Sequence, residues 1–293
     1  MVRVVTAGHI NWDVTLRVDS FPVADGEAVI RSQRQSGGGS AGNVAASLAG
    51  FGIETGLIGS VGDDDNGLLA RQELEDAGVS LDRVCVVDGA DTAVKYLLVD
   101  DEGEVAILGN DGVNEAIGPD DVDESGIRTA EHVHITGQRP ETAAAIATAA
   151  HESDTTVSVD PGRRIADRNF TRTLEVADIV FANDRESAVL LEDHFGQSIG
   201  IDRFVVVKHG EDGAVVHAPN GSYTHAGFDV DPVDTAGAGD AFAAGFIARL
   251  LEGDDVERAL EYGNACGALT ASAHGARNAP STEEISAFLG SRF

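Results

Sequence analysis

Short apolar runs alternate with helix-like segments along most of the chain, and this alternation limits the fold more than any other feature. Four of the runs are "VRVVTAG" (2–8), "EHVHITG" (131–137), "ADIVFAND" (177–184) and "FVVVKHG" (204–210). They have the composition of strands buried on both faces, and polar residues or glycines follow them. Segments 41–52 and 141–153 between them are rich in helix formers. The pattern predicts a layered α/β fold, whose ligands bind at the carboxyl ends of parallel strands.

Two segments depart from this pattern. Residues 14–35 and 91–110 alternate apolar and polar side chains, which is typical of strands with one solvent-exposed face. The second segment contains a turn signal, "DDEGE", that predicts a hairpin. We therefore expect a small β-sheet lid, with strands within about 14–36 and 91–110. No linker or repeat divides the sequence, so we expect one domain over residues 1–293.

Charge restricts the possible partners. Fifty acidic residues face twenty lysines and arginines, only two of them lysines, and the formal net charge is -30. Such a surface repels polyanions, so we expect neither nucleic acid nor membrane as a partner. Its spread along the whole chain favours a salt-loving, halophilic host. No long apolar segment, signal peptide or cysteine framework is evident, and we expect a cytoplasmic enzyme.

The stretch "DTAGAGD", residues 234–240, is the strongest chemical motif. Glycines allow a close approach of the backbone to a ligand, and the alanine-rich segment that follows predicts a helix. A helix N-terminus with small residues can bind a phosphate group, and Asp240 beside it can act as a base toward an attacking hydroxyl group. From this motif alone, a glycine-rich turn with Asp240 as a helix cap is an equal alternative.

Taken together, "GGGSAGNVAASLAGFG" (37–52) and "DTAGAGDAFAAGF" (234–246) resemble the paired signatures of the PfkB carbohydrate kinases, the ribokinase-like family. The resemblance covers the whole chain. It implies a three-layer α/β/α fold with a central, mostly parallel sheet and a β-sheet lid, and ATP with Mg²⁺ as cofactors. It also implies that Asp240 is the catalytic base and that the backbone of Gly237, Ala238 and Gly239 forms an anion hole.

The G-x-G-x-x-G of dinucleotide-dependent oxidoreductases does not follow the first strand, and the P-loop of other kinases is absent. A non-catalytic sugar-binding regulator would be expected to have lost Asp240 or the glycines.

On the nucleotide side, the resemblance assigns roles to residues at strand ends and in two later segments. Asn183 and Glu186 in "NDRE" match a motif that positions Mg²⁺ and phosphates, although the same spacing also predicts a capping box. Asp234 would help to form a monovalent-cation site, usually filled by K⁺. The remaining nucleotide-binding candidates are Lys208, Gly210, Gly213, Asn264, Gly275 and Ala276. For Asn264, a merely structural role within its helix is an equal alternative.

On the acceptor side, the resemblance points to hydroxyl-binding residues in the first third of the chain. These are Asn11, Asp13, Gly38, Gly39 and Asn43, and a carboxylate such as Asp13 can accept hydrogen bonds from two hydroxyl groups. An Asx turn is the alternative for Asn11 and Asp13. The resemblance implies a sugar or sugar derivative as substrate and allows a homodimer formed through the lids.

The charge of the acceptor is open at this level. Ribokinases usually carry a lysine within the glycine motif, and this chain has "GGSAGN" instead, which argues against plain ribose. Arginines gather at two strand ends, "TGQRP" and "DPGRR", and arginine binds phosphate or carboxylate in a bidentate manner. An anionic acceptor, either a sugar phosphate or a sugar acid, would contact Lys95, Gln138, Arg139 and Arg163, with Arg164 beside them. The alternatives are a ribokinase or nucleoside kinase with a neutral acceptor, and arginines that merely pair with surface acids.

Overall fold

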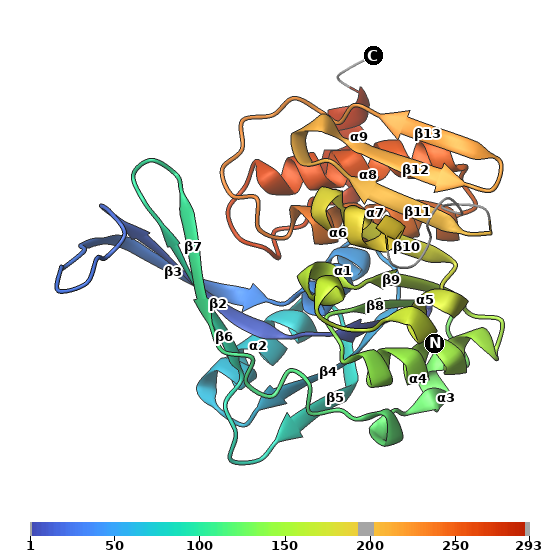
Figure 1. The fold of residues 1–293 in the computed structure, drawn as a ribbon, viewed down its shortest axis with the longest axis horizontal. Coiled ribbons are helices and arrows are strands. Elements are labelled where there is room, and N and C mark those ends of the chain that lie inside the picture. The colour runs from blue at the N-terminus through green and yellow to red at the C-terminus, as the bar shows by residue number, and fades with distance from the viewer. Residues whose placement is uncertain (1, 193–201, 291–293) are drawn as a thin grey trace.

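A nine-stranded sheet forms the centre of the molecule in the computed structural model, which describes residues 2–192 and 202–290 (Figure 1). The strand order is β13-β12-β11-β10-β9-β8-β1-β4-β5. Every neighbouring pair is parallel except those of β12, which runs antiparallel to both of its neighbours. The strands are β1 Val4–Gly8, β4 Thr55–Gly62, β5 Ser80–Val87, β8 His132–Thr136, β9 Thr156–Asp160, β10 Ile179–Asn183, β11 Phe204–Lys208, β12 Ala214–Ala218 and β13 Gly221–His225. The expected mostly parallel sheet is confirmed.

Helices cover both faces of this sheet. They are α1 Ser40–Gly50, α2 Asp65–Asp76, α3 Glu124–Ile127, α4 Pro140–His151, α5 Thr171–Val176, α6 Asp184–Leu190, α7 Ala238–Leu251, α8 Val256–Ala271 and α9 Thr282–Gly290, with short 3-10 turns at Pro119–Asp121, Gly162–Ala166 and Gly210–Asp212. Because successive side chains of a strand face opposite sides, Val4 packs in one core with Leu48 of α1 and Phe246 of α7, whereas Val5 packs in another with Ile146 of α4. The three layers follow from these two cores. Among the described helices, none is both long and apolar enough to cross a membrane.

A second sheet of four strands, in the order β3-β2-β6-β7, projects from one side of the main body (Figure 1). Its strands are β2 Asn11–Val18, β3 Ile30–Gly38, β6 Ala93–Val99 and β7 Val105–Gly109, with the hairpin turn between β6 and β7. The first segment in which we expected lid strands contains β2 and β3, which residues 19–29 connect, and the second contains β6 and β7. However, β2 begins at Asn11 and β3 ends at Gly38, so the lid sheet includes residues that we assigned to the acceptor pocket.

The parallel topology fixes where polar residues meet. Strands β1 and β8 to β11 run in the same direction, so their carboxyl ends lie along one edge of the sheet. Asp160, Asn183 and Lys208 are the last residues of β9, β10 and β11, and Asn183 lies directly beside Lys208 in the register. A cavity of about 1640 Å³ separates this edge from the small sheet.

Candidate active site

The first turn of α7 is built to leave its backbone open. Gly237 caps the helix in the left-handed conformation (φ 76°), and a Cβ atom there would collide with the carbonyl oxygen of Ala276. The first backbone N–H groups of a helix have no acceptor within the helix. The Ala238 N–H donates to the Thr235 carbonyl oxygen at 3.3 Å, and Gly237, Ala238 and Gly239 carry little side chain to cover the turn. The turn can therefore accept an anion.

Asp234 holds this turn in place. Its Oδ1 accepts a hydrogen bond from the Ala236 N–H at 3.0 Å, and its Oδ2 accepts one from the Gly275 N–H at 3.1 Å. The carboxylate thus joins the chain before α7 to the loop around residue 275. Both Gly275 and Ala276 lie beside the anion turn in this arrangement.

Asp240 stands within the first turn of α7 and faces α1. The Asn43 amide Nδ2 donates a hydrogen bond to its Oδ2 at 2.8 Å. Burial raises the pKa of Asp240 to about 6, although the contacts with Asn43 and Lys208 favour the charged form. An aspartate with this pKa is ionised at neutral pH and is a stronger base than an exposed one. The helix-cap alternative does not describe Asp240, because the cap position belongs to Gly237.

Lys208 supplies a positive charge next to the same turn. Its Nζ donates to Asp160 Oδ2 at 2.7 Å and lies 3.4 Å from the position that a Cβ of Gly239 would take. Burial disfavours its charge, but Asp160 more than compensates and raises the pKa of Lys208. A cation is therefore fixed beside the anion turn, where a larger residue at 239 would crowd it.

Asn183 and Glu186 form the capping box that the sequence allows. Asn183 Oδ1 accepts hydrogen bonds from the N–H groups of Arg185 and Glu186, and Glu186 Oε2 accepts from the Asn183 N–H at 2.9 Å. Burial also raises the pKa of the Glu186 carboxyl. Within residues 2–192 and 202–290 no cluster of three acidic, histidine or cysteine side chains could enclose a metal ion. A Mg²⁺ ion here would depend on phosphate oxygens and water for most of its ligands.

The other nucleotide-binding candidates occupy varied positions. Gly210 (φ 64°) and Gly213 (φ 84°) flank the short turn after β11, and a Cβ on Gly213 would strike the backbone of His225. Asn264 donates from Nδ2 to the Leu260 carbonyl oxygen of its own helix at 2.8 Å, which is the local role considered as an alternative.

The acceptor candidates meet where β1, β2, β3 and α1 join. Gly38 lies against the Asp13 carboxylate. Gly39 (φ 89°), just before α1, lies so close to His9 that a side chain on residue 39 would collide with the His9 carbonyl oxygen. Burial raises the pKa of Asp13 to about 6, against the opposing effects of two nearby cations. Among described residues, nothing donates a hydrogen bond to three buried oxygens, namely Asp13 Oδ1, Asn43 Oδ1 and Gln138 Oε1. Buried acceptors without donors suit the hydroxyl groups of a ligand.

Arg277 is a pocket residue that the sequence did not reveal. Its guanidinium group is buried beneath the glycine motif, and Nη2 donates to the Gly38 carbonyl oxygen at 2.8 Å. A Cβ atom on Gly37 would overlap Nη1. Burial lowers the pKa of Arg277 to about 10, and its charge in turn favours the ionised form of Asp13. Gly37, the first of three consecutive glycines, was the available signal, since a glycine is needed there only because Arg277 packs against it.

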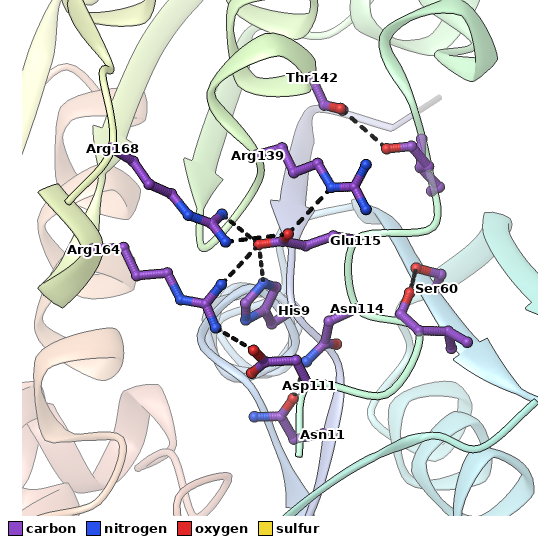
Figure 2. A network of polar contacts seen from close by, with 12 residues as sticks. His9, Asn11, Ser60, Asp111, Asn114, Glu115, Arg139, Thr142, Arg164 and Arg168 are labelled. Carbon is purple, nitrogen blue, oxygen red and sulfur yellow. Dashed lines mark hydrogen bonds and ion pairs between the residues drawn. The ribbon is translucent and has the colours of Figure 1, made fainter. Parts of the chain in front are cut away.

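A cluster of charged side chains lies next to this pocket (Figure 2). At its centre Glu115 is paired with Arg139 at 3.2 Å, Arg164 at 3.1 Å and Arg168 at 2.6 Å, while His9 Nε2 lies 3.8 Å away. These contacts hold the pKa of Glu115 well below its usual value, and His9 contributes most to this effect, followed by Arg168. Arg139 and Arg164 thus pair with an acidic residue, which is the alternative to anion binding that the sequence left open. The sequence-based prediction did not include Glu115 and Arg168. Arg163 is exposed and lines the cavity between the two sheets.

The chain is similar to known carbohydrate kinases over its length. Residues 1–283 match the family model of the pfkB family carbohydrate kinases. An ATP-dependent ribose-1-phosphate kinase of Halopiger xanaduensis is 67% identical over 296 residues, which cover 100% of both chains. The ribokinase of Bacillus subtilis is 26% identical over 99% of this chain and 100% of its own.

Solved structures show the same fold. A ribokinase of Thermotoga maritima superimposes with a TM-score of 0.88 at 24% identity, covering 99% of this chain and 100% of that chain. An Arabidopsis thaliana ribokinase complexed with ribose and ATP gives a TM-score of 0.88 at 24% identity, with 99% of each chain covered.

Proposed function

The chain belongs to the pfkB family of carbohydrate kinases and is an ATP-dependent sugar phosphotransferase, and we propose that its acceptor is ribose 1-phosphate. One observation carries this proposal, the 67% identity with a ribose-1-phosphate kinase over the full length of both chains. The scarce cations gathered next to the acceptor pocket of a chain with a net charge of -30 support an anionic acceptor.

In the proposed reaction, Asn11 and Asp13 hold the neighbouring 2- and 3-hydroxyl groups of the ribose ring. Asp240 then takes the proton of the 5-hydroxyl group as its oxygen attacks the γ-phosphorus atom of ATP. A bond forms between these two atoms, the bond from the γ-phosphorus to the bridging oxygen breaks, and ADP leaves. The products are ADP and ribose 1,5-bisphosphate, and the proton remains on Asp240 until it is released to solvent.

The anion turn stabilises the charge of this transfer. The N–H groups of residues 237–239 would donate to the oxygens of the transferring phosphoryl group, and Lys208 would place its ammonium group beside them. The Lys208–Asp160 pair keeps that charge in position. Gly210 and Gly213 would allow the turn after β11 to approach the nucleotide, with Gly275, Ala276 and Asn264 farther along the same site. Closure of the small sheet over the cavity would exclude water and limit hydrolysis of ATP.

Two ions would complete this site. Mg²⁺, held by ATP and through water by Asn183 and Glu186, would neutralise phosphate charge. The Asp234 carboxylate already accepts two backbone hydrogen bonds, and its remaining lone pairs suit a monovalent cation such as K⁺. We also propose a cytoplasmic location, where ATP is available, and a homodimer formed through the small sheets, whose exposed side chains include Val105, Ile107 and Leu108.

An acceptor screen tests the proposed substrate. ADP release would be coupled to a second enzyme in high KCl, with ribose 1-phosphate, ribose, adenosine, fructose 6-phosphate and ribonate as acceptors. We expect ribose 1-phosphate to give the highest kcat/KM, and the Asp240→Asn variant measures background ATP hydrolysis. A higher kcat/KM for ribose or adenosine would reject the proposal in favour of a ribokinase or nucleoside kinase.

A further inference from the structure

The charged cluster of Figure 2 holds more positive charge than its acids neutralise. The cations of this cluster in the figure are Arg139, Arg164 and Arg168, and its carboxylates are Glu115 and Asp111. Lys95, which the figure does not draw, joins the cluster through its ion pair with Asp111. Among the lysine, arginine and carboxylate side chains of these ion pairs, four cations against two carboxylates leave two positive charges in excess. In a chain with only 20 lysines and arginines and a net charge of -30, this local excess is unusual. A phosphate monoester, with about 1.5 to 2 negative charges near pH 7, would balance it.

The two carboxylates of the cluster differ in their surroundings. The Glu115 side chain is 14% exposed and contacts three arginines, so it fixes their positions from below. The Asp111 side chain is 53% exposed and bridges two cations, Arg164 Nη2 at 2.6 Å and Lys95 Nζ at 3.1 Å. Glu115 is therefore part of the support of the cluster, whereas Asp111 is an exposed anion between two cations. An incoming phosphate group can replace such an anion, because the displaced carboxylate returns to water.

The Asp111 bridge adjoins the acceptor pocket on two sides. Lys95 is the direct neighbour of Asp13 in the register of β6 and β2, and its charge acts on that carboxyl group. Asn114, three residues after Asp111, donates from Nδ2 to Asn11 Oδ1 at 2.7 Å. A bound ribose held by Asn11 and Asp13 would thus lie beside the bridge.

The shape of the sugar defines which end of it faces the bridge. In a ribofuranose ring, C1 and C4 flank the ring oxygen, so a phosphate group on C1 and the hydroxymethyl group on C4 point away from each other. Asp240 lies on α7 and bonds to Asn43 of α1, whereas the bridge joins β6 to the segment after β9. With the 5-hydroxyl group at Asp240, we place the C1 substituent toward Lys95 of β6 and Arg164 of the turn Gly162–Ala166.

Resting on the proposed function, the geometry points to Arg164 and Lys95 as the site that binds the 1-phosphate group of the acceptor, with Asp111 occupying that site until the phosphate displaces it. Glu115 and Arg168 are positioning residues that hold Arg164. The class of ligand is a sugar carrying a phosphate group on C1.

Single substitutions separate this site from the rest of the pocket. We expect Arg164→Ala and Lys95→Ala each to raise the KM for ribose 1-phosphate about 10- to 100-fold, the range for losing a hydrogen bond between charged groups. The KM for ATP should stay within about threefold, because the nucleotide side is untouched. Arg128→Ala is the matched control, since it removes an arginine from exposed ion pairs with Glu124 and Glu152 outside the site.

Asp111→Asn gives the sharper result, because the two explanations predict opposite signs. If Asp111 competes with the phosphate, its neutralisation frees both cations, and the KM for ribose 1-phosphate should fall about threefold or more. If Asp111 only keeps Arg164 in place, the variant should resemble Arg164→Ala and raise that KM. Equilibrium titration of each variant with ribose 1-phosphate, in the presence of ADP, checks that KM follows binding.

The outcomes distinguish the inference from the proposed function. If the wild-type protein phosphorylates ribose 1-phosphate but Arg164→Ala and Lys95→Ala leave its KM within threefold, the phosphate site is wrong and the substrate is right. An increase of KM in Asp111→Asn would also overturn the displacement. If the wild-type protein prefers an acceptor without a phosphate group, both proposals fail together.

Discussion

Replacement of Asp240 by asparagine should inactivate the enzyme and at the same time stabilise its fold. The amide keeps the shape of the carboxyl group, and its oxygen can still accept the hydrogen bond from Asn43 Nδ2. It cannot accept a proton from the sugar, so kcat should fall by about 100- to 10,000-fold, the usual contribution of a general base. The KM for ATP should change little.

The gain in stability follows from the raised pKa. Burial moves the pKa of Asp240 from 3.8 to about 6. Between these values the folded protein binds more protons than the unfolded chain, so the free energy of unfolding falls as the pH rises through this range. Above pH 6 the full cost applies, and the shift corresponds to about 3 kcal/mol. Because asparagine does not ionise, the variant avoids this cost.

Urea unfolding followed by the fluorescence of the single tryptophan, Trp12, measures the effect, since this side chain is only 5% exposed in the folded protein. We expect the variant to be more stable than the wild type by about 3 kcal/mol at pH 8 and by about half of that at pH 5. Asp101→Asn, in an exposed turn, removes the same charge as a control and should change the stability by less than about 0.5 kcal/mol. A variant no more stable than the wild type at pH 8, or a difference that does not shrink toward pH 5, would refute the assigned burial cost.

Two further predictions concern the same pocket. Asp240 and Asp13 both have a pKa of about 6, and both would act as carboxylates. As the pH falls below 6, log(kcat/KM) should therefore decrease with a slope approaching two in the wild type and a slope of one in Asp13→Asn. A decrease that begins only near pH 4 would contradict this prediction. Gly237→Ala should destabilise the fold by about 1 kcal/mol or more beyond the effect of Gly253→Ala, and it should also lower kcat. Both glycines have positive φ, but nothing lies within 4 Å of a Cβ atom at position 253. Equal effects of the two substitutions in thermal unfolding would therefore rule out the collision at Gly237.

The parts of the site that recur in short motifs were predictable from sequence. The glycine turn before α7 has a local cause, the need for a left-handed residue and open N–H groups, and the structure places Gly237 there. Strand ends were predictable as well, because apolar runs that end in polar residues place Asn183 and Lys208 on one edge once the sheet is parallel.

The charged cluster could not be predicted in the same way. Glu115 lies in a loop with no periodic pattern, and its partners Arg139, Arg164 and Arg168 come from two other segments of the chain. In a sequence with 50 acids, nothing local marks Glu115 as the acid that pairs with three arginines. Arg277 is similar, since its contact with Gly38 spans 239 positions in the sequence. Such contacts depend on how distant segments pack, which the residue pattern of each segment does not contain.

Strand β2 begins with Asn11 and Asp13, our candidates for sugar binding, and runs to Val18 in the projecting sheet. The distance from Asp13 to Val18 is about 17 Å for an extended chain. A rotation of about 10° at the pocket end would therefore move the far end of the strand by about 3 Å. With Asn11 and Asp13 holding the sugar as proposed, a small shift of these residues would be amplified into a larger displacement of the small sheet over the cavity.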